Sequence, residues 1–388
     1  MSAGIRRRFA DLSCRALQSV LPLPLQPWGR AIRCETAGIA NDTKALLFAL
    51  DSVRGLLPRA LAIHLSKLFV APACGGLLSM RFYTGAMRRP RAVGIACAIG
   101  AVVLGLAYMA IAGAPLRYLA INSGALIVGL ALLLLCGRAR DANVKDINWP
   151  GQILGMSVVL LVTTLLGQSA EGATRWLLLG GLAVQPSLVL LPVMIVTFAR
   201  SRNLLGTVGI LVAAGVLAWQ PDRAMAGMLA AGLTALALVR PDRFVVGALS
   251  LSVAGFGATL TRPDSLPASP YVDQILYSAF DVHILAGVAV LAGALLLLVP
   301  AILGWRYDAA RTEIYLVFGV TWLAAIAAAA LGNYPTPMVG YGGSAIIGYA
   351  LSLVALPKRT TAHSQAPGQS SSPADAHPQD RHLRLELA

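Results

Sequence analysis

Ten long apolar segments follow one another between residues 92 and 356, and they constrain the fold more than any other feature of the sequence. Each is about 15 to 28 residues long, close to the roughly 20 residues that a helix needs to cross a bilayer core. Because lipid offers no partner to a free backbone N–H or C=O, such segments have to be helices. We therefore expect an all-α polytopic membrane protein with about ten transmembrane helices. The expected spans are 92–112, 116–136, 151–168, 182–199, 203–219, 224–240, 244–260, 275–302, 314–331 and 342–356.

Composition supports this fold class and limits the kinds of partner. Hydrophobic residues make up 57% of the chain and charged residues only 12%, whereas soluble domains carry about 25% charged residues. The net charge of +14 is explained by basic residues in short cytoplasmic loops, and the sequence lacks the aromatic–basic pattern of a nucleic-acid site. The five cysteines and five histidines are scattered. We expect no nucleic-acid partner, structural disulfide, zinc site or organic cofactor, and leave a divalent cation open.

The distribution of basic residues over the loops predicts the orientation. With a cytoplasmic N-terminus, every inner loop carries at least two Lys or Arg residues, as in Arg88-Arg89, Arg138-Ala-Arg140 and Arg200-Ser-Arg202. The outer loops then carry only Arg117, Arg175, Arg223 and Arg262. Basic residues concentrate in cytoplasmic loops of membrane proteins. We expect a multi-pass protein of the bacterial inner membrane with both termini in the cytoplasm.

Two end regions differ from the membrane domain at 91–357. Residues 1–90 form a cytoplasmic or interfacial amphipathic region, in which apolar residues recur every three or four positions between 28 and 69. Arg54, Arg59 and Lys67 suit a helix that lies on an anionic membrane surface. Residues 60–80 read as an interfacial or re-entrant segment, with an eleventh span as the alternative. The tail at 358–388 is rich in Ser, Pro, Gln, His and Ala and is expected to be disordered.

Two ionisable residues, Asp281 and His283, fall inside the expected eighth span, 275–302. An uncompensated charge within a span costs at least ~2.5 kcal/mol, so such residues usually face a polar cavity. Asp281 follows Asp273 by eight residues, about two helical turns. A carboxylate at the mouth of a cavity and a second one deeper inside are therefore expected.

Four segments on the expected outer side form an ordered set of motifs. They are Gly172-Ala-Thr-Arg175-Trp176 with Gln185-Pro186-Ser187, Gln220-Pro221-Asp222, Val272-Asp273 through Asp281 to Gly287, and Pro335-Thr-Pro337-Met-Val-Gly-Tyr341-Gly342-Gly343-Ser344. Together, in this order, they resemble motifs of the SEDS family (shape, elongation, division and sporulation), to which RodA, FtsW and SpoVE belong. The resemblance covers residues 92–357.

The resemblance implies polymerisation of lipid II into peptidoglycan glycan strands, in division or in cell-shape maintenance, beside a penicillin-binding transpeptidase. It implies that Asp273 aligns with the family's essential acidic residue and is the catalytic base, and Asp281 would support it from below. Such a carboxylate takes the proton of the attacking sugar hydroxyl, and cations neutralise the diphosphate leaving group. Arg175 and Arg223 are expected to lie near each other and to bind that diphosphate. The expected substrate-binding residues are Arg175, Trp176, Asp222, Arg223, Tyr341, Gly342, Gly343 and Ser344.

Departures from the family pattern keep other functions open. Leu188 stands where the family's Q-P-S-E motif has an acid, and Asp281 alone stands for a pair of glutamates. One alternative is a non-catalytic scaffold of the division or elongation machinery. Another is a transporter of lipid-linked sugars, for which internal repeats are expected and no clear repeat is present. The sequence does not choose between division, elongation and sporulation.

Overall fold

The computed structural model describes residues 3–22, 25–69, 89–142, 148–170, 173–180, 182–262 and 267–357. The expected disordered tail and most of the segment expected to be interfacial or re-entrant, from residue 70 onward, lie outside these residues.

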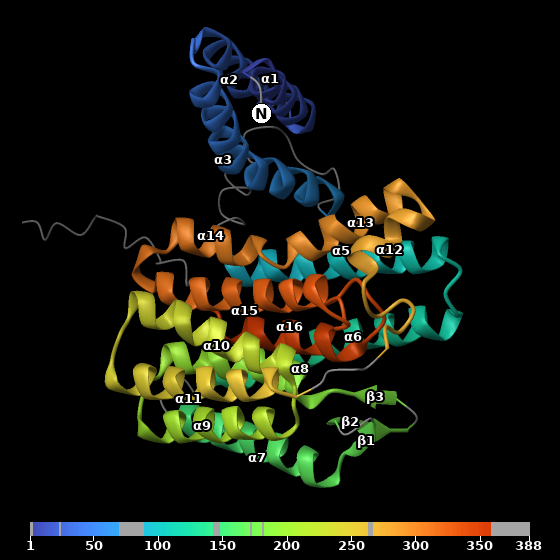
Figure 1. Ribbon diagram of the computed structural model, residues 1–388, viewed down its shortest axis with the longest axis vertical. Coiled ribbons are helices and arrows are strands. Elements are labelled where there is room, and N and C mark those ends of the chain that lie inside the picture. Colours follow the sequence, from blue (N-terminus) through green and yellow to red (C-terminus); the bar gives the residue numbers. More distant parts are fainter. Residues whose placement is uncertain are drawn as a thin grey trace, which may run out of the picture. The chain divides into compact units, whose positions relative to one another are not determined.

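Within the described ranges, residues 90–355 form a bundle of apolar helices that run back and forth along one direction (Figure 1). Six helical segments are long and apolar enough to cross a membrane, and four shorter apolar helices complete the ten expected spans. The chain is therefore a multi-pass α-helical membrane protein. The bundle helices are α5 (Pro90–Ile111), α6 (Leu116–Ala142), α7 (Trp149–Leu166), α8 (Pro186–Arg200), α9 (Leu204–Trp219), α10 (Arg223–Val239), α11 (Arg243–Leu260), α12 (Ile275–Val282), α13 (Ile284–Leu296), α14 (Val299–Tyr307), α15 (Thr312–Leu331) and α16 (Gly343–Ala355).

The expected eighth span is wrong at its start. The short helix α12 ends before His283, whose backbone is extended with φ −168°, and the span itself begins with α13. The His283 Nδ1 atom accepts a hydrogen bond from the Leu285 N–H at 3.1 Å, so this side chain caps α13. Asp281 and His283 are both exposed. The break between α12 and α13 places both polar side chains outside the span, so neither ionisable group is buried within it.

The expected fourth span also begins later than position 182. Three short antiparallel strands precede it: β1 (Gln168–Ala170), β2 (Ala173–Leu179) and β3 (Leu182–Val184). Leu177 pairs with Val184 and Leu179 with Leu182. The helix α8 then starts at Pro186, which is favoured in a first helical turn because it has no N–H to leave unbonded.

At the end of the bundle opposite these strands, two arginines hold the last turn of α16. The Arg91 Nη2 atom donates to the Val354 carbonyl at 2.7 Å, and Arg200 Nη1 donates to the Ala355 carbonyl at 2.8 Å. The last carbonyls of a helix have no partner within it, so these bonds satisfy them. The first turn of α5 and the last turns of α8 and α16 therefore meet at one end, as the expected inner loops require.

Three amphipathic helices precede the bundle: α1 (Ala3–Val20), α2 (Gln26–Gly38) and α3 (Asp42–Phe69). The helices α1 and α3 pack through small residues, with Ala10 and Cys14 in the middle of α1 against Ala45 and Ala49 near the start of α3. In their second halves Leu17 packs in a cluster with Leu56. The two helices are therefore parallel, and α2 runs back between them in the chain.

Candidate functional site

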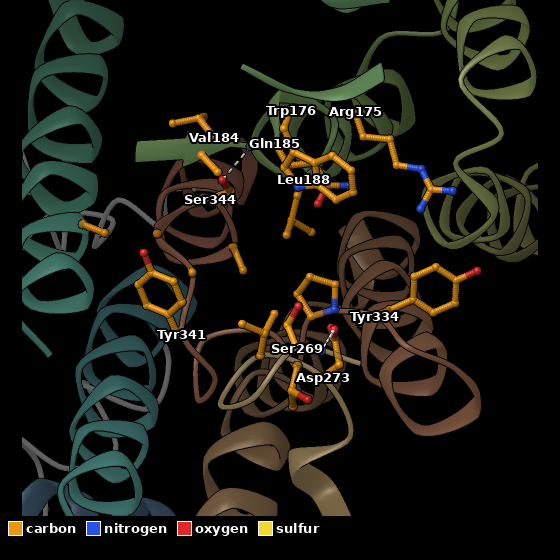
Figure 2. A pocket seen from close by; sticks show the side chains of 18 of the residues that line it. Arg175, Trp176, Val184, Gln185, Leu188, Ser269, Asp273, Tyr334, Tyr341 and Ser344 are labelled. Atoms are coloured by element: carbon orange, nitrogen blue, oxygen red, sulfur yellow. Dashed lines mark hydrogen bonds between the residues drawn. The ribbon is translucent and has the colours of Figure 1, made fainter. Parts of the chain in front are cut away.

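A cavity of about 600 Å³ lies at the end of the bundle where the strands are (Figure 2). It has two chemically different parts. The wall from α6 and β3 is mostly apolar, and the rest of the lining carries carboxylate, amide, guanidinium and hydroxyl groups. The apolar part comprises Ile121, Gly124, Ala125, Val128, Leu182, Ala183, Val184, Leu188 and Ile347. The polar part comprises Arg175, Gln185, Ser269, Asp273, Asn333, Tyr334 and Ser344.

Asp273 lies in the loop before α12, and the backbone fixes its position. Tyr271 and Gln274 on either side have left-handed backbone with φ of 64° and 56°. Asp273 pairs with Pro335 in an isolated antiparallel bridge. Its Oδ2 atom accepts the Ser269 N–H at 2.9 Å, and its own N–H donates to the Ser269 carbonyl at 3.0 Å. The N-cap of α12 is Gln274, so Asp273 does not cap this helix.

The second carboxylate oxygen of Asp273, Oδ1, differs from Oδ2 in having no hydrogen-bond partner among the described residues. Oδ1 is also buried. Burial raises the pKa of Asp273, and the Ser269 N–H partly opposes this shift. A buried carboxylate with one unpartnered oxygen beside a cavity is suited to accept a proton or a hydrogen bond from a bound ligand.

The segment 341–344 forms one wall of the cavity, and α6 holds it. Asn122 is completely buried and lies in the second turn of the apolar helix α6. Its Nδ2 atom donates to the Gly340 carbonyl at 2.9 Å, and its Oδ1 atom accepts the Gly342 N–H at 3.1 Å. One turn earlier, the Tyr118 ring stacks on the Tyr341 ring at 3.8 Å. Gly342 has φ 151°, which side chains disfavour, so a glycine is required there.

Arg175 and Trp176 line the cavity from β2 (Figure 2). The Arg175 side chain is buried, and its Nη2 atom donates to the Pro221 carbonyl at 2.6 Å. The guanidinium is thus fixed by the turn that leads into α10 and remains at the cavity edge. Trp176 places a large ring beside it.

Asp222 supports the cavity wall from behind and does not line the cavity. It is buried, and Oδ2 accepts from Gln185 Nε2 at 3.1 Å and from the Ser187 hydroxyl at 3.0 Å. The Gln185 N–H in turn donates to the Ser344 hydroxyl at 2.9 Å. Asp222 thereby links β3, α8, α10 and α16, which makes it a positioning residue for Gln185 and Ser344.

Seven of the ten expected site residues line one cavity: Asp273, Arg175, Trp176, Tyr341, Gly342, Gly343 and Ser344. Asp222, Arg223 and Asp281 do not line it. Arg223 Nη2 donates to the Arg262 carbonyl at 2.9 Å, along the loop side of α10. The placement of Asp281 deeper in the span below Asp273 is wrong, because Asp281 lies exposed near the end of α12.

Two residues that hold the cavity wall, Asn122 and Tyr118, were not expected from the sequence. Asn122 carried a usable signal, since a polar amide inside an apolar span usually faces a protein partner. Leu188 lines the cavity and is 5% exposed, so the position of the absent family acid is an apolar part of the wall. Among the described residues no three His, Cys, Asp or Glu side chains gather into a potential metal site.

Comparison with known proteins identifies the fold. No protein-family model matches this chain, and no curated protein matches it. The crystal structure of the Thermus thermophilus rod shape determining protein RodA matches with a TM-score of 0.51 and 21% sequence identity. The match covers 66% of this chain and 92% of that protein. A point mutant of the same RodA gives 0.48 and 21%, over 66% and 93% of the two chains. The class defined here is a polytopic helical membrane protein with a RodA-like fold.

Proposed function

We propose that this chain is a SEDS-type peptidoglycan glycosyltransferase that polymerises lipid II. The main support for this proposal is the environment of the Asp273 carboxylate. It is half-buried beside a cavity, and one of its oxygens has no hydrogen-bond partner among the described residues. The same cavity has a fixed guanidinium at its edge and an extended apolar wall. A substrate with a sugar, a diphosphate and a prenyl chain requires these three environments.

In the proposed reaction Asp273 is the general base. The acceptor sugar hydroxyl attacks the anomeric carbon of the donor, and a new C–O bond forms there. The bond from that carbon to the diphosphate oxygen breaks, and prenyl diphosphate leaves with the electron pair. The hydroxyl proton passes to the Asp273 carboxylate, whose raised pKa strengthens it as a base.

Arg175 is the proposed partner of the leaving diphosphate. Negative charge builds on the bridging oxygen as the bond breaks, and a preorganised cation stabilises that charge. The hydrogen bond to the Pro221 carbonyl holds the guanidinium in place before substrate binds. The apolar residues of α6 and β3 are suited to the first isoprene units of the lipid, because burying apolar surface is favourable.

The orientation and partners belong to the same proposal. The cavity end faces the periplasm, both termini lie in the cytoplasm, and the membrane is the bacterial inner membrane. The loop charges support this orientation. A membrane-anchored penicillin-binding transpeptidase would cross-link the product, and the division or elongation machinery would recruit the chain.

The test is polymerisation of lipid II by the purified protein in lipid nanodiscs, with and without a transpeptidase partner. We expect glycan strands from the wild type and none from Asp273→Asn, which keeps the shape of the side chain and removes the base. Asp281→Asn is the matched control, because Asp281 is exposed outside the cavity. Wild-type rates from a folded Asp273→Asn protein would overturn the assignment.

A non-catalytic scaffold is the second candidate, and Leu188 is the observation that favours it. Leu188 makes the position of the family's acid apolar within the same cavity. A scaffold would bind lipid II or a partner without turnover. Failure of both the wild type and Leu188→Glu to polymerise lipid II, while substrate binding persists, would favour this candidate.

A further inference from the structure

The helices α1 and α3 present a shared face that no other described helix of the N-terminal region covers. One side of α1, which carries Arg7 and Asp11, contacts α2. Arg7 donates to the Ala37 carbonyl of α2, and the Arg33 guanidinium of α2 lies 3.8 Å from the Asp11 carboxylate. Arg6 lies on the other side of the α1–α3 contact, away from α2. It donates to the Thr43 hydroxyl of α3 at 2.7 Å.

Helical spacing places large apolar side chains on that second side. With about 100° between successive residues, Phe9 lies on the side of α1 away from Asp11, and Leu12 follows about 60° further round, at the outer edge of α1 opposite Ala10 and Cys14. On α3, Leu47 and Leu50 follow Thr43 at intervals of four and seven, so they lie on the Thr43 side. All four are exposed, at 54%, 59%, 62% and 49%. We call Phe9, Leu12, Leu47 and Leu50 the α1–α3 face.

Basic side chains border the α1–α3 face on both edges. Arg8 is exposed next to the α1 residues, and Arg54 is exposed one turn after Leu50. Arg15 is also near, but it pairs with Asp11 at 2.6 Å. Asp51 is the exposed acid beside the face. Across residues 3–69 there are ten Lys or Arg and four Asp or Glu, so the region as a whole is strongly basic.

We infer that the α1–α3 face binds an anionic lipid leaflet. Exposed Phe and Leu side chains with flanking arginines are the chemistry by which amphipathic helices enter a headgroup layer. The charge is complementary to an anionic leaflet, where each Lys or Arg near the surface adds about fivefold to partitioning. The chain also enters the membrane with α5, only 20 residues after α3 ends, so the leaflet is always within reach of the region.

The experiment uses the full chain in nanodiscs of phosphatidylcholine with or without phosphatidylglycerol. A single cysteine at Leu12→Cys or Leu50→Cys carries a nitrobenzoxadiazole label, with the native cysteines replaced. The native Cys34, exposed on α2, is the matched control position. We expect spin-labelled lipid to quench positions 12 and 50 in anionic discs, position 34 much less, and all positions less in phosphatidylcholine alone.

Charge reversal separates this inference from general lipid contact. Arg8→Glu with Arg54→Glu should lower the partitioning of the labelled face by more than tenfold in anionic discs. Three results would overturn the inference: equal quenching at positions 12 and 34, equal quenching with and without phosphatidylglycerol, or a blue-shifted label at position 12 that lipid does not quench. The last result would mean that protein, such as a second copy of the chain, covers the face.

Discussion

At the residue scale, the raised pKa of Asp273 ties activity to pH. Burial disfavours the charged carboxylate and so raises the pKa of Asp273 above its usual 3.8. We expect kcat/KM for lipid II polymerisation to rise with pH across the acidic range and then level off, because only ionised Asp273 takes the proton. Initial rates over this range would show it. A rate that is flat down to pH values near 3.8 would contradict the role of Asp273.

The same shift has a consequence for stability with a definite sign. A carboxyl whose pKa is higher in the folded chain binds protons more tightly there than in the unfolded chain. Its contribution to stability is present below the unfolded pKa and is lost as pH rises through the folded pKa. Asp273→Asn should therefore melt at the wild-type temperature or higher at neutral pH. A lower melting temperature would mean that the carboxylate serves the fold.

Two arginines of similar sequence context provide a matched comparison. Arg175 lines the cavity, whereas Arg223 bonds the Arg262 carbonyl outside it. We expect Arg175→Ala to weaken lipid II binding by about tenfold to a hundredfold, the size of a charge-assisted hydrogen bond, and Arg223→Ala to have little effect. Titration of lipid II into each purified variant measures this. Equal losses in both variants would place the diphosphate elsewhere.

The sequence predicted these residue types better than their positions. Arg175, Asp222 and Arg223 share family-like motifs, but a motif does not say which side of a turn faces the ligand. That choice depends on the tertiary contact between Arg175 and the Pro221 carbonyl. Asp222 looked like a ligand for substrate and instead bonds Gln185 and Ser187 within the protein.

At the scale of elements, α6 is the helix that shapes the cavity wall. We expect Asn122→Leu to lower stability, because it leaves the buried Gly340 carbonyl and Gly342 N–H without partners at about 1 to 3 kcal/mol each. It should also weaken lipid II binding, since Tyr341 lies between these two groups. Ser123→Ala is the control: that hydroxyl donates to the Leu119 carbonyl of its own helix. Similar melting temperatures for both variants would contradict the positioning role.

The hydropathy of the sequence predicted the apolar segments correctly, but it did not predict where a helix is interrupted within such a segment. The segment 275–302 is continuously apolar around Asp281 and His283, so it was expected to be one span. The extended backbone at His283 divides it into α12 and α13. The strand β3 is apolar too, and a short apolar run does not distinguish a strand from the start of a helix.

At the scale of the whole molecule, the loop charges and the bundle agree on which helix ends lie together. The number of spans follows from apolar length alone, which is why the sequence predicted ten. The cavity did not follow from it, since its residues come from segments as distant as 121 and 347. Only the packing of α6, α8, α15 and α16 brings them together.

The orientation of the bundle gives the last prediction. Pro115, between α5 and α6, and Pro241, between α10 and α11, are both exposed loop prolines. They lie at opposite ends of the bundle if the helices alternate in direction. We expect Pro115→Cys to react with a membrane-impermeant maleimide in cells with a permeabilised outer membrane, and Pro241→Cys to react only after lysis. The positive-inside bias gives the reason, because Arg240 and Arg243 flank Pro241. Reaction of Pro241→Cys in unlysed cells would place the cavity in the cytoplasm, where a polymerase of exported glycan strands would have no function.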